Sequence, residues 1–273
     1  MAEIDSTENL LKVISSNNVI IYGAGYIARR FIRGLKKNNL DKKVIEVVTT
    51  NGSDEEIYGF KVKSIDSVII SEEDLICIAV HESIKDDIIY ELRKREIEKY
   101  AWVAPYAFEM IAGYPISKDV KVPLHTVWRA ERERVGIPIR CLVIDQFKGL
   151  NDCGFKIYLH HLNLFNKSSE TSKKRLYYFL KFINDVDKGK TEKEEPISIT
   201  NNGDIIDGTH RTAIAIWKNH KEISCDVYNV EYNEVQDDRT NTYISDASNI
   251  GFADSEIKEI KRMRDMIDRQ MEN

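Results

Sequence analysis

Short apolar runs alternate with helical segments between residues 15 and 105. The runs at 19–22, 44–48 and 75–80 have the apolar character of strands, and those at 26–37 and 83–94 are typical of helices. Strands that alternate with helices form a parallel sheet, because each helix returns the chain to the same edge. The alternation therefore predicts an α/β fold with a doubly wound parallel sheet in this part of the chain.

A glycine-rich turn follows the first strand. Its sequence, Gly23-Ala24-Gly25-Tyr26-Ile27-Ala28, has the G-x-G-x-x-A spacing in which the second glycine lets the backbone approach a phosphate. Gly23, Gly25 and Tyr26 are therefore candidate nucleotide-binding residues. A NAD site normally has an acid at the end of the second strand, where this chain has Thr49, Thr50 and Asn51. A nucleotide or nucleotide-sugar ligand, a packing role for the glycines and a dinucleotide site all stay open.

This N-terminal region is similar to a known class of domain. Tyr22-Gly23-Ala24-Gly25, with the runs at 59–62 and 76–80, resembles the Rossmann-like domains of bacterial surface-polysaccharide enzymes. The N-terminal domain of sugar acyltransferases, which holds a nucleotide-sugar, is one of them. The resemblance covers residues 15–105 and implies nucleotide-sugar binding. The hexapeptide repeats that follow in those acyltransferases are absent here, so acyl transfer is not implied.

The second half of the chain predicts another domain. Proline residues at 115, 123 and 138 interrupt any regular pattern, which indicates a connecting region over residues 111–140. This region would join a first domain at 1–110 to a second domain at 141–273. The alternating charges at 128–134 indicate a solvated helix face. Helical spacing returns at 170–186, a hairpin of strands is expected at 196–206, and a helix at 209–218. The amphipathic helix at 254–271 predicts either core packing or a homodimer contact.

One short sequence in this domain favours binding of an anion. In Asp207-Gly208-Thr209-His210-Arg211, the glycine permits a tight strand-to-helix turn, and the free N–H groups of Thr209, His210 and Arg211 point out of the helix start. The guanidinium of Arg211 adds a positive charge that can donate two parallel hydrogen bonds to an anion. His210 could donate to a β- or γ-phosphate oxygen. Asp207 is a carboxylate that could hold Mg²⁺ or accept a hydroxyl proton.

The same residues resemble a known superfamily. The hairpin and turn from Pro196 to Arg211 look like the α+β ParB/sulfiredoxin fold. Sulfiredoxins hold ATP phosphates at the equivalent turn, but Thr209 stands here at the reactive cysteine, so their reduction chemistry is not expected. The free serine kinases, with Asp-Gly-His-His-Arg, differ from this turn at one position. The resemblance implies ATP as phosphate donor, Asp207 as a catalytic or metal carboxylate, and phosphate binding by His210 and Arg211.

The catalytic base of those kinases lies upstream and has several candidates here. Asp145 follows a strand-like run and is our preferred candidate, and Glu194 and Glu195 precede the first strand of the hairpin. These assignments predict an ATP- and Mg²⁺-dependent phosphotransferase that acts on a small hydroxylated molecule, with surface-glycan biosynthesis as a setting. A nucleotide-binding protein without catalysis stays an alternative. A purely structural turn, with Asp207 as a helix cap and with His210 and Arg211 in a structural hydrogen-bond network, is the third interpretation.

Composition limits the classes of function. The chain has a formal net charge of −5 and therefore lacks the broad positive field on which non-specific DNA binding depends. No DNA partner is expected. The four cysteines form no CxxC pair, which argues against a zinc site or a disulfide framework. No apolar run approaches the length of a membrane span, and residues 1–15 do not have the pattern of a signal peptide. A cytoplasmic location is therefore expected.

Overall fold

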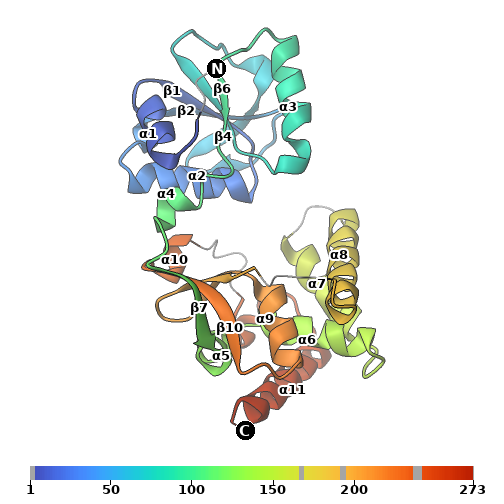
Figure 1. Cartoon of the computed structure of the whole chain (residues 1–273). Helices are drawn as coiled ribbons and strands as arrows, with labels where there is room; N and C mark the ends of the chain where they lie inside the picture. Colours follow the sequence, from blue (N-terminus) through green and yellow to red (C-terminus); the bar gives the residue numbers. More distant parts are fainter. Residues whose placement is uncertain (1–3, 166–168, 191–194, 236–241, 273) are drawn as a thin grey trace. The chain divides into compact units, whose positions relative to one another are not determined.

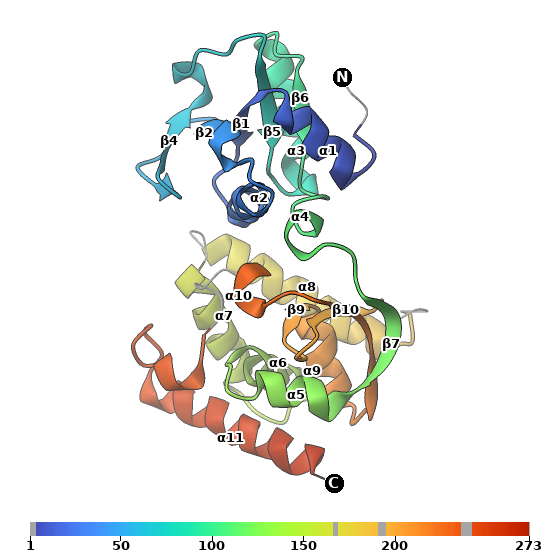
Figure 2. The same cartoon turned by 90° about the vertical axis from the view of Figure 1, so that its left-hand side faces the viewer.

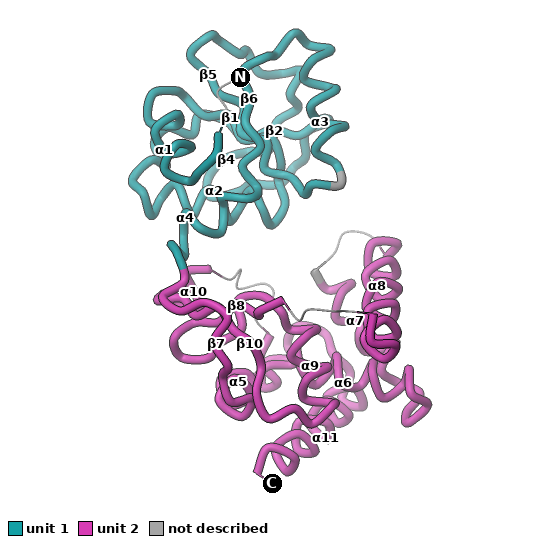
Figure 3. Tube along the Cα trace, viewed as in Figure 1, with its two compact units in different colours: residues 1–114 teal, residues 115–273 magenta. Residues whose placement is uncertain are grey.

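The computed structural model describes residues 4–165, 169–190, 195–235 and 242–272. The chain divides into two compact units, Met1–Tyr114 and Pro115–Asn273 (Figure 3). The stretch at 111–140 is not a connecting region. It contains β7 (Ser117–Pro123), α5 (Leu124–Glu131) and the start of α6 (Gly136–Phe147), which all belong to unit 2. Unit 2 therefore begins at residue 115 rather than at residue 141.

Unit 1 is built on a six-stranded sheet with the order β3-β4-β2-β1-β5-β6. Its strands are β1 (Asn18–Tyr22), β2 (Val44–Thr49), β3 (Glu56–Ile57), β4 (Phe60–Ser64), β5 (Asp74–Ile78) and β6 (Tyr100–Trp102). Its helices are α1 (Thr7–Ser15), α2 (Tyr26–Lys37), α3 (Glu82–Lys94) and α4 (Glu109–Ala112). All neighbouring strands pair in parallel except β3, which is antiparallel to β4. The predicted α/β class is confirmed.

Helices cover both faces of this sheet because successive side chains of its strands point to opposite faces. Val19 and Ile21 of β1 belong to the core with α1 and α2, whereas Ile20 and Tyr22 belong to the core with α3. Figure 1 shows α1 and α2 on one side and α3 on the other. Burial on both faces explains why these strands are continuous apolar runs.

Unit 2 combines a four-stranded sheet with a layer of helices. Its strands, in the order β7-β10-β8-β9, include β8 (Ile197–Thr200), β9 (Ile205–Asp207) and β10 (Glu222–Tyr228). Its further helices are α7 (Gly154–Phe165), α8 (Ser169–Asp187), α9 (Thr209–Trp217), α10 (Tyr232–Val235) and α11 (Asp254–Met271). The sheet is mixed, because β8 is parallel to β10 while the two outer pairs are antiparallel.

The C-terminal helix packs within unit 2. Ile260, Met263 and Ile267 of α11 are buried in the same core as α6, and Figure 2 shows α11 running beneath α6. Of the two interpretations of this amphipathic pattern, core packing is the one that the structure shows. These buried side chains thus belong to the core of unit 2, and a homodimer contact through the helix stays a prediction. Within the described residues, no helix combines the length and apolar composition that crossing a bilayer requires.

A buried ion network ties α5 to the β8–β9 hairpin. Arg134 is 7% exposed and pairs with Glu131, and its second terminal nitrogen lies 2.8 Å from a carboxylate oxygen of Asp204. Glu131 also accepts a hydrogen bond from the backbone N–H of Ile205, at 2.8 Å. The interpretation of 128–134 as a solvated helix face is therefore wrong for these two residues. Their alternating charges pair inside the unit rather than facing water.

Candidate functional site

The predicted strand-to-helix turn lies between β9 and α9. Gly208 is the first cap residue of α9, with a left-handed φ of 105°, and no side chain caps the helix. The interpretation of Asp207 as a helix cap is therefore wrong. The first backbone N–H groups of a helix have no acceptor within it. The turn thus presents uncapped donors of α9, as an anion site requires.

Position 208 requires glycine because of both its close packing and its backbone conformation. A Cβ there would lie 2.4 Å from Cγ2 of Ile197, and the φ disfavours any other residue. Left-handed backbone costs roughly 1–2 kcal/mol and overpacking roughly 1–3 kcal/mol. We expect Gly208→Ala to lower the free energy of unfolding by about 3 kcal/mol in urea denaturation. Gly189→Ala is the matched control, because its φ is also positive, 64°, but no atom lies within 4 Å of an added Cβ. Equal losses would rule out the contact with Ile197.

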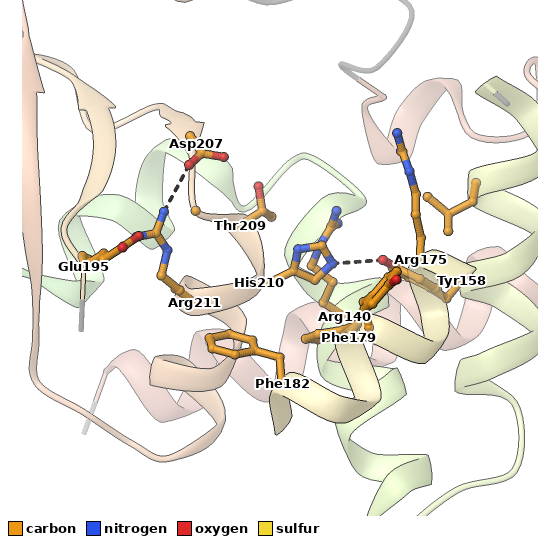
Figure 4. Close-up of a pocket in the computed structure, with 13 residues that line it drawn as sticks. Arg140, Tyr158, Arg175, Phe179, Phe182, Glu195, Asp207, Thr209, His210 and Arg211 are labelled. Atoms are coloured by element: carbon orange, nitrogen blue, oxygen red, sulfur yellow. Dashed lines mark hydrogen bonds and ion pairs between the residues drawn. The ribbon is translucent and has the colours of Figure 1, made fainter. Parts of the chain in front are cut away.

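The turn forms one wall of a pocket of about 650 Å³. This volume lies in the range of small-molecule sites. The other walls come from α6, α7 and α8, so the pocket joins elements that are far apart in the sequence (Figure 4). Beyond the turn itself, its lining residues are Arg140, Tyr158, Leu162, Arg175, Tyr178, Phe179, Phe182 and Glu195.

Two arginines of this pocket have no carboxylate partner among the described residues. Nη1 of Arg140 donates to the backbone oxygen of Gly136 at 2.8 Å, while its buried Nε has no hydrogen-bond partner. Burial and the nearby charge of Arg175 lower the pKa of Arg140. The desolvated charge of Arg140 is costly without a partner, whereas Arg175 is exposed. The arrangement therefore favours an anionic ligand between these side chains. Neither arginine stands out in the sequence as a candidate ligand-binding residue.

Arg211 is largely engaged by the protein itself. Its Nη1 donates to the backbone oxygens of Glu195 and Pro196 at 2.8 and 2.9 Å, and its Nη2 lies 3.0 Å from a carboxylate oxygen of Asp207. These bonds hold the start of β8 against α9. Arg211 lines the pocket, as predicted for a phosphate ligand, but much of its donor capacity is already used. Phosphate binding falls more naturally to Arg140 and Arg175.

The two carboxylates of the pocket lie on the side of Arg211. The Asp207 side chain is 78% exposed and that of Glu195 is 88% exposed, and the Glu195 carboxylate lies 3.9 Å from Nη1 of Arg211. Figure 4 shows both acids beside Arg211, with Arg140 and Arg175 grouped around His210 and Tyr158. The pocket therefore has an acidic side and a cationic side. Thr209 lies between them.

His210 is half-buried on the cationic side. Its Nε2 lies 2.9 Å from the hydroxyl of Tyr158, and the Phe179 ring packs at a centroid distance of 4.3 Å. Burial lowers the pKa of His210 well below its usual value, and Arg140, Arg175 and Arg211 lower it further. The expectation of a donor to phosphate therefore applies to a neutral imidazole in the free protein.

Asp145 does not belong to this pocket. It lies in helix α6 rather than after a strand, so that part of the prediction is wrong. It is 8% exposed, and its carboxylate accepts a hydrogen bond of 2.9 Å from Nε1 of Trp217. Trp217 is the last residue of α9, at the opposite end from the turn. Glu195, the alternative base, lines the pocket, and Glu194 lies outside the described residues.

The N-terminal glycine turn lies in unit 1, between β1 and α2. Gly23 has a φ of 133°, and a Cβ there would lie 2.6 Å from the backbone oxygen of Ala79, so close packing alone requires glycine. Gly25 caps α2, and a Cβ there would meet no atom within 4 Å. The ring of Tyr26 lies 4.3 Å from the guanidinium of Arg30. A packing role thus explains Gly23, whereas ligand binding at Gly25 and Tyr26 stays a prediction.

Comparisons of the chain with models of protein families, with curated proteins and with solved structures found no match. The site must therefore be interpreted from its own chemistry. Among the residues that the structure describes, no three side chains of His, Cys, Asp or Glu gather as a metal site. Mg²⁺ in phosphate-transferring sites commonly uses one or two carboxylates together with substrate phosphates. Asp207 and Glu195 are the pocket residues of that type.

Proposed function

We propose that this chain is an ATP-dependent phosphotransferase that acts on a small hydroxylated molecule. One observation carries the proposal: Arg140 and Arg175 face the uncapped start of α9 across a single pocket, with exposed carboxylates on its other side. Cations and helix N-termini bind phosphate, and carboxylates bind Mg²⁺ or accept a proton. Phosphoryl transfer requires both kinds of group in one site. A cytoplasmic setting in surface-glycan biosynthesis is part of the proposal.

The two sides of the pocket give the substrates an orientation. Arg140, Arg175 and the N–H groups of the turn would bind the phosphate chain, because Nε of Arg140 has no hydrogen-bond partner and the first N–H groups of α9 have no acceptor within the helix. Phe182 and Tyr178 line the same pocket and offer apolar area for a base or sugar ring. The hydroxyl acceptor would then lie towards Asp207 and Glu195. The protein itself would form no covalent bond to the substrates, because positioning and charge stabilisation dominate the catalysis of phosphoryl transfer.

Asp207 and Glu195 fit the roles of metal ligand and proton acceptor. Both are exposed carboxylates, and Arg211 pairs with each of them. Mg²⁺, when bound, would neutralise charge on the transferring phosphoryl group. Asp207 is the last residue of β9 and is therefore better fixed than Glu195, which lies outside any strand, so we assign metal binding to it. Glu195 takes the place of Asp145 as the proposed base.

Replacement of Asp207 tests the proposal. Asp207→Asn keeps the shape of the side chain and the hydrogen bond to Arg211 but removes the charge. We expect at least a 100-fold loss of Mg²⁺-dependent ADP formation across a panel of hydroxyl acceptors, the scale of a lost acid–base or metal group. ATP binding without Mg²⁺, measured by calorimetry, should change less than threefold.

The matched control is Asp265→Asn, which also removes an exposed aspartate that is paired with an arginine, Arg264, but in α11 outside the pocket. Its turnover should equal that of the wild-type protein. Turnover that survives Asp207→Asn, or an absence of turnover in the wild type with every acceptor tried, would contradict the kinase proposal.

A nucleotide-binding protein without chemistry is the second candidate. It is favoured by the position of Asp145, which is bonded to Trp217, and by the ion pair of Asp207 with Arg211. Asp145 is therefore outside the pocket, and Asp207 is already paired. Fewer carboxylates are then available for catalysis than the resemblance to the free serine kinases implies. Tight binding of ATP or a nucleotide-sugar without turnover, lost on removal of Arg140, would support this candidate.

A further inference from the structure

The imidazole of His210 is held in one orientation by two helices. Tyr158 of α7 contacts Nε2 through its hydroxyl at 2.9 Å, and Phe179 of α8 packs against the ring at 4.3 Å. Figure 4 shows the ring between Tyr158 and Thr209, with its second nitrogen, Nδ1, on the side away from Tyr158. Nδ1 therefore lies on the side of Thr209, the first residue of α9, and Nε2 on the side of Tyr158.

The charged and titratable groups around the ring determine which nitrogen holds the proton. Arg140 of α6, Arg175 of α8 and Arg211 of α9 are cations, and Tyr158 of α7 is a hydroxyl. Arginine donates only, so none of the three can accept a proton from the tyrosine. Either atom of this 2.9 Å hydrogen bond can be its donor. Because no other acceptor for the hydroxyl lies among the described residues, we assign the donation to Tyr158. In a neutral imidazole one nitrogen accepts and the other donates, so acceptance at Nε2 places the proton on Nδ1.

We propose that Tyr158 is a positioning residue that fixes His210 as a neutral imidazole with its proton on Nδ1, aimed at an oxygen of a bound phosphate. The assignment of phosphate as the acceptor rests on the proposed function. The tautomer itself rests only on the geometry of the free protein. His210 then acts beside the N–H groups of α9 as one more donor, and not as the acid or base of the reaction.

The environment makes this state persist across ordinary pH. Burial and three guanidinium groups disfavour the imidazolium, which would add a fourth positive charge to the cluster. Burial also raises the pKa of Tyr158, so its hydroxyl keeps the proton that it donates. A neutral donor has an advantage here, because it binds phosphate oxygen without the cost of burying another charge.

Nitrogen-15 NMR of the histidine side chains in the ligand-free protein tests the tautomer directly. We expect His210 to show a protonated Nδ1 and a bare Nε2 at every pH from 5.5 to 8. In Tyr158→Phe this preference should be lost, with the Nε2-protonated form rising to at least a third of the population. Tyr177→Phe is the matched control, because it removes an exposed tyrosine hydroxyl of α8 that does not line the pocket. It should leave the tautomer unchanged.

A wild-type spectrum with the proton on Nε2, or an imidazolium at pH 7, would overturn the proposal even if Tyr158→Phe failed to fold. Titration with inorganic phosphate then tests the donor role. We expect Tyr158→Phe to weaken phosphate binding three- to tenfold and Tyr177→Phe to leave it unchanged. Equal affinity in both variants would contradict the donor role. The correct tautomer in a protein without kinase turnover would refute the proposed function while leaving the positioning role of Tyr158 intact.

Discussion

Replacement of Arg140 with methionine is expected to weaken binding of ATP about 10- to 100-fold while leaving the fold as stable as before. Hydrogen bonds to charged groups contribute roughly 1.5–3 kcal/mol each, which corresponds to that range. Arg140 lines the pocket, and its Nε has no protein partner, so its loss removes a ligand contact and one hydrogen bond, from Nη1 to the backbone oxygen of Gly136. Calorimetric titration with ATP and with inorganic phosphate measures the loss.

The free energy of unfolding of Arg140→Met distinguishes a ligand-binding role of this arginine from a structural one. Desolvation already lowers the pKa of Arg140, which means that the folded protein holds this charge at a cost. Methionine fills a similar volume without charge, so the free energy of unfolding should stay constant or rise by about 1 kcal/mol. A variant that binds ATP normally, or one that unfolds more easily by over 1 kcal/mol, would show that Arg140 serves the fold instead.

The parts of the fold that the sequence predicted are those with a local signature. The helix expected at 26–37 is α2, Tyr26–Lys37, because Ile27, Phe31 and Leu35 repeat at helical spacing and glycine precedes them. The turn at Gly208 was recognised for the same reason: a strand, a glycine and a helix follow one another within a few residues. Such patterns depend on neighbours in the sequence, so no tertiary information was needed.

Helix α6 shows why other parts were missed. Residues from Ile137 to Asp145 are buried almost throughout, so the helix has apolar residues on all sides and lacks an amphipathic period. Pro138 also argued against a helix, although proline is tolerated in a first turn. Asp145 was consequently placed after a strand and near the phosphate turn. Its helix instead directs it to Trp217.

The arginines of the pocket had no signal in the sequence. Arg175 follows Lys173 and Lys174 in a helix whose charges look like an ordinary solvated face. Arg140 lies about 70 positions from His210, and their proximity depends on how α6 packs against α9. Whether an arginine is paired with an acid or faces a ligand is decided by such packing. The turn could therefore be predicted from the sequence, but the groups that face it could not.

Replacement of Arg134 with methionine is expected to have the opposite effect to that of Arg140→Met. Arg134 is also desolvated, but it pairs with Glu131 and Asp204, and its guanidinium lies 3.9 Å from the centre of the Tyr232 ring. Its loss leaves the carboxylate of Glu131 buried at 5% exposure without its cation. Removal of one partner from a buried ion pair costs roughly 3–5 kcal/mol. Urea denaturation should show a loss of that size.

A second substitution identifies the cause of this loss. Burial already raises the pKa of Glu131, so without Arg134 the carboxylate is the unfavourable group. Glu131→Gln keeps a side-chain oxygen for the backbone N–H of Ile205 but removes the charge. Introduced together with Arg134→Met, it should restore at least about 1 kcal/mol, because the uncompensated charge is gone. If the double variant is no more stable than Arg134→Met alone, lost packing against Tyr232 causes the instability. The different effects of Arg134→Met and Arg140→Met on stability would then come from the packing area that each arginine loses. They would not come from whether its charge is paired.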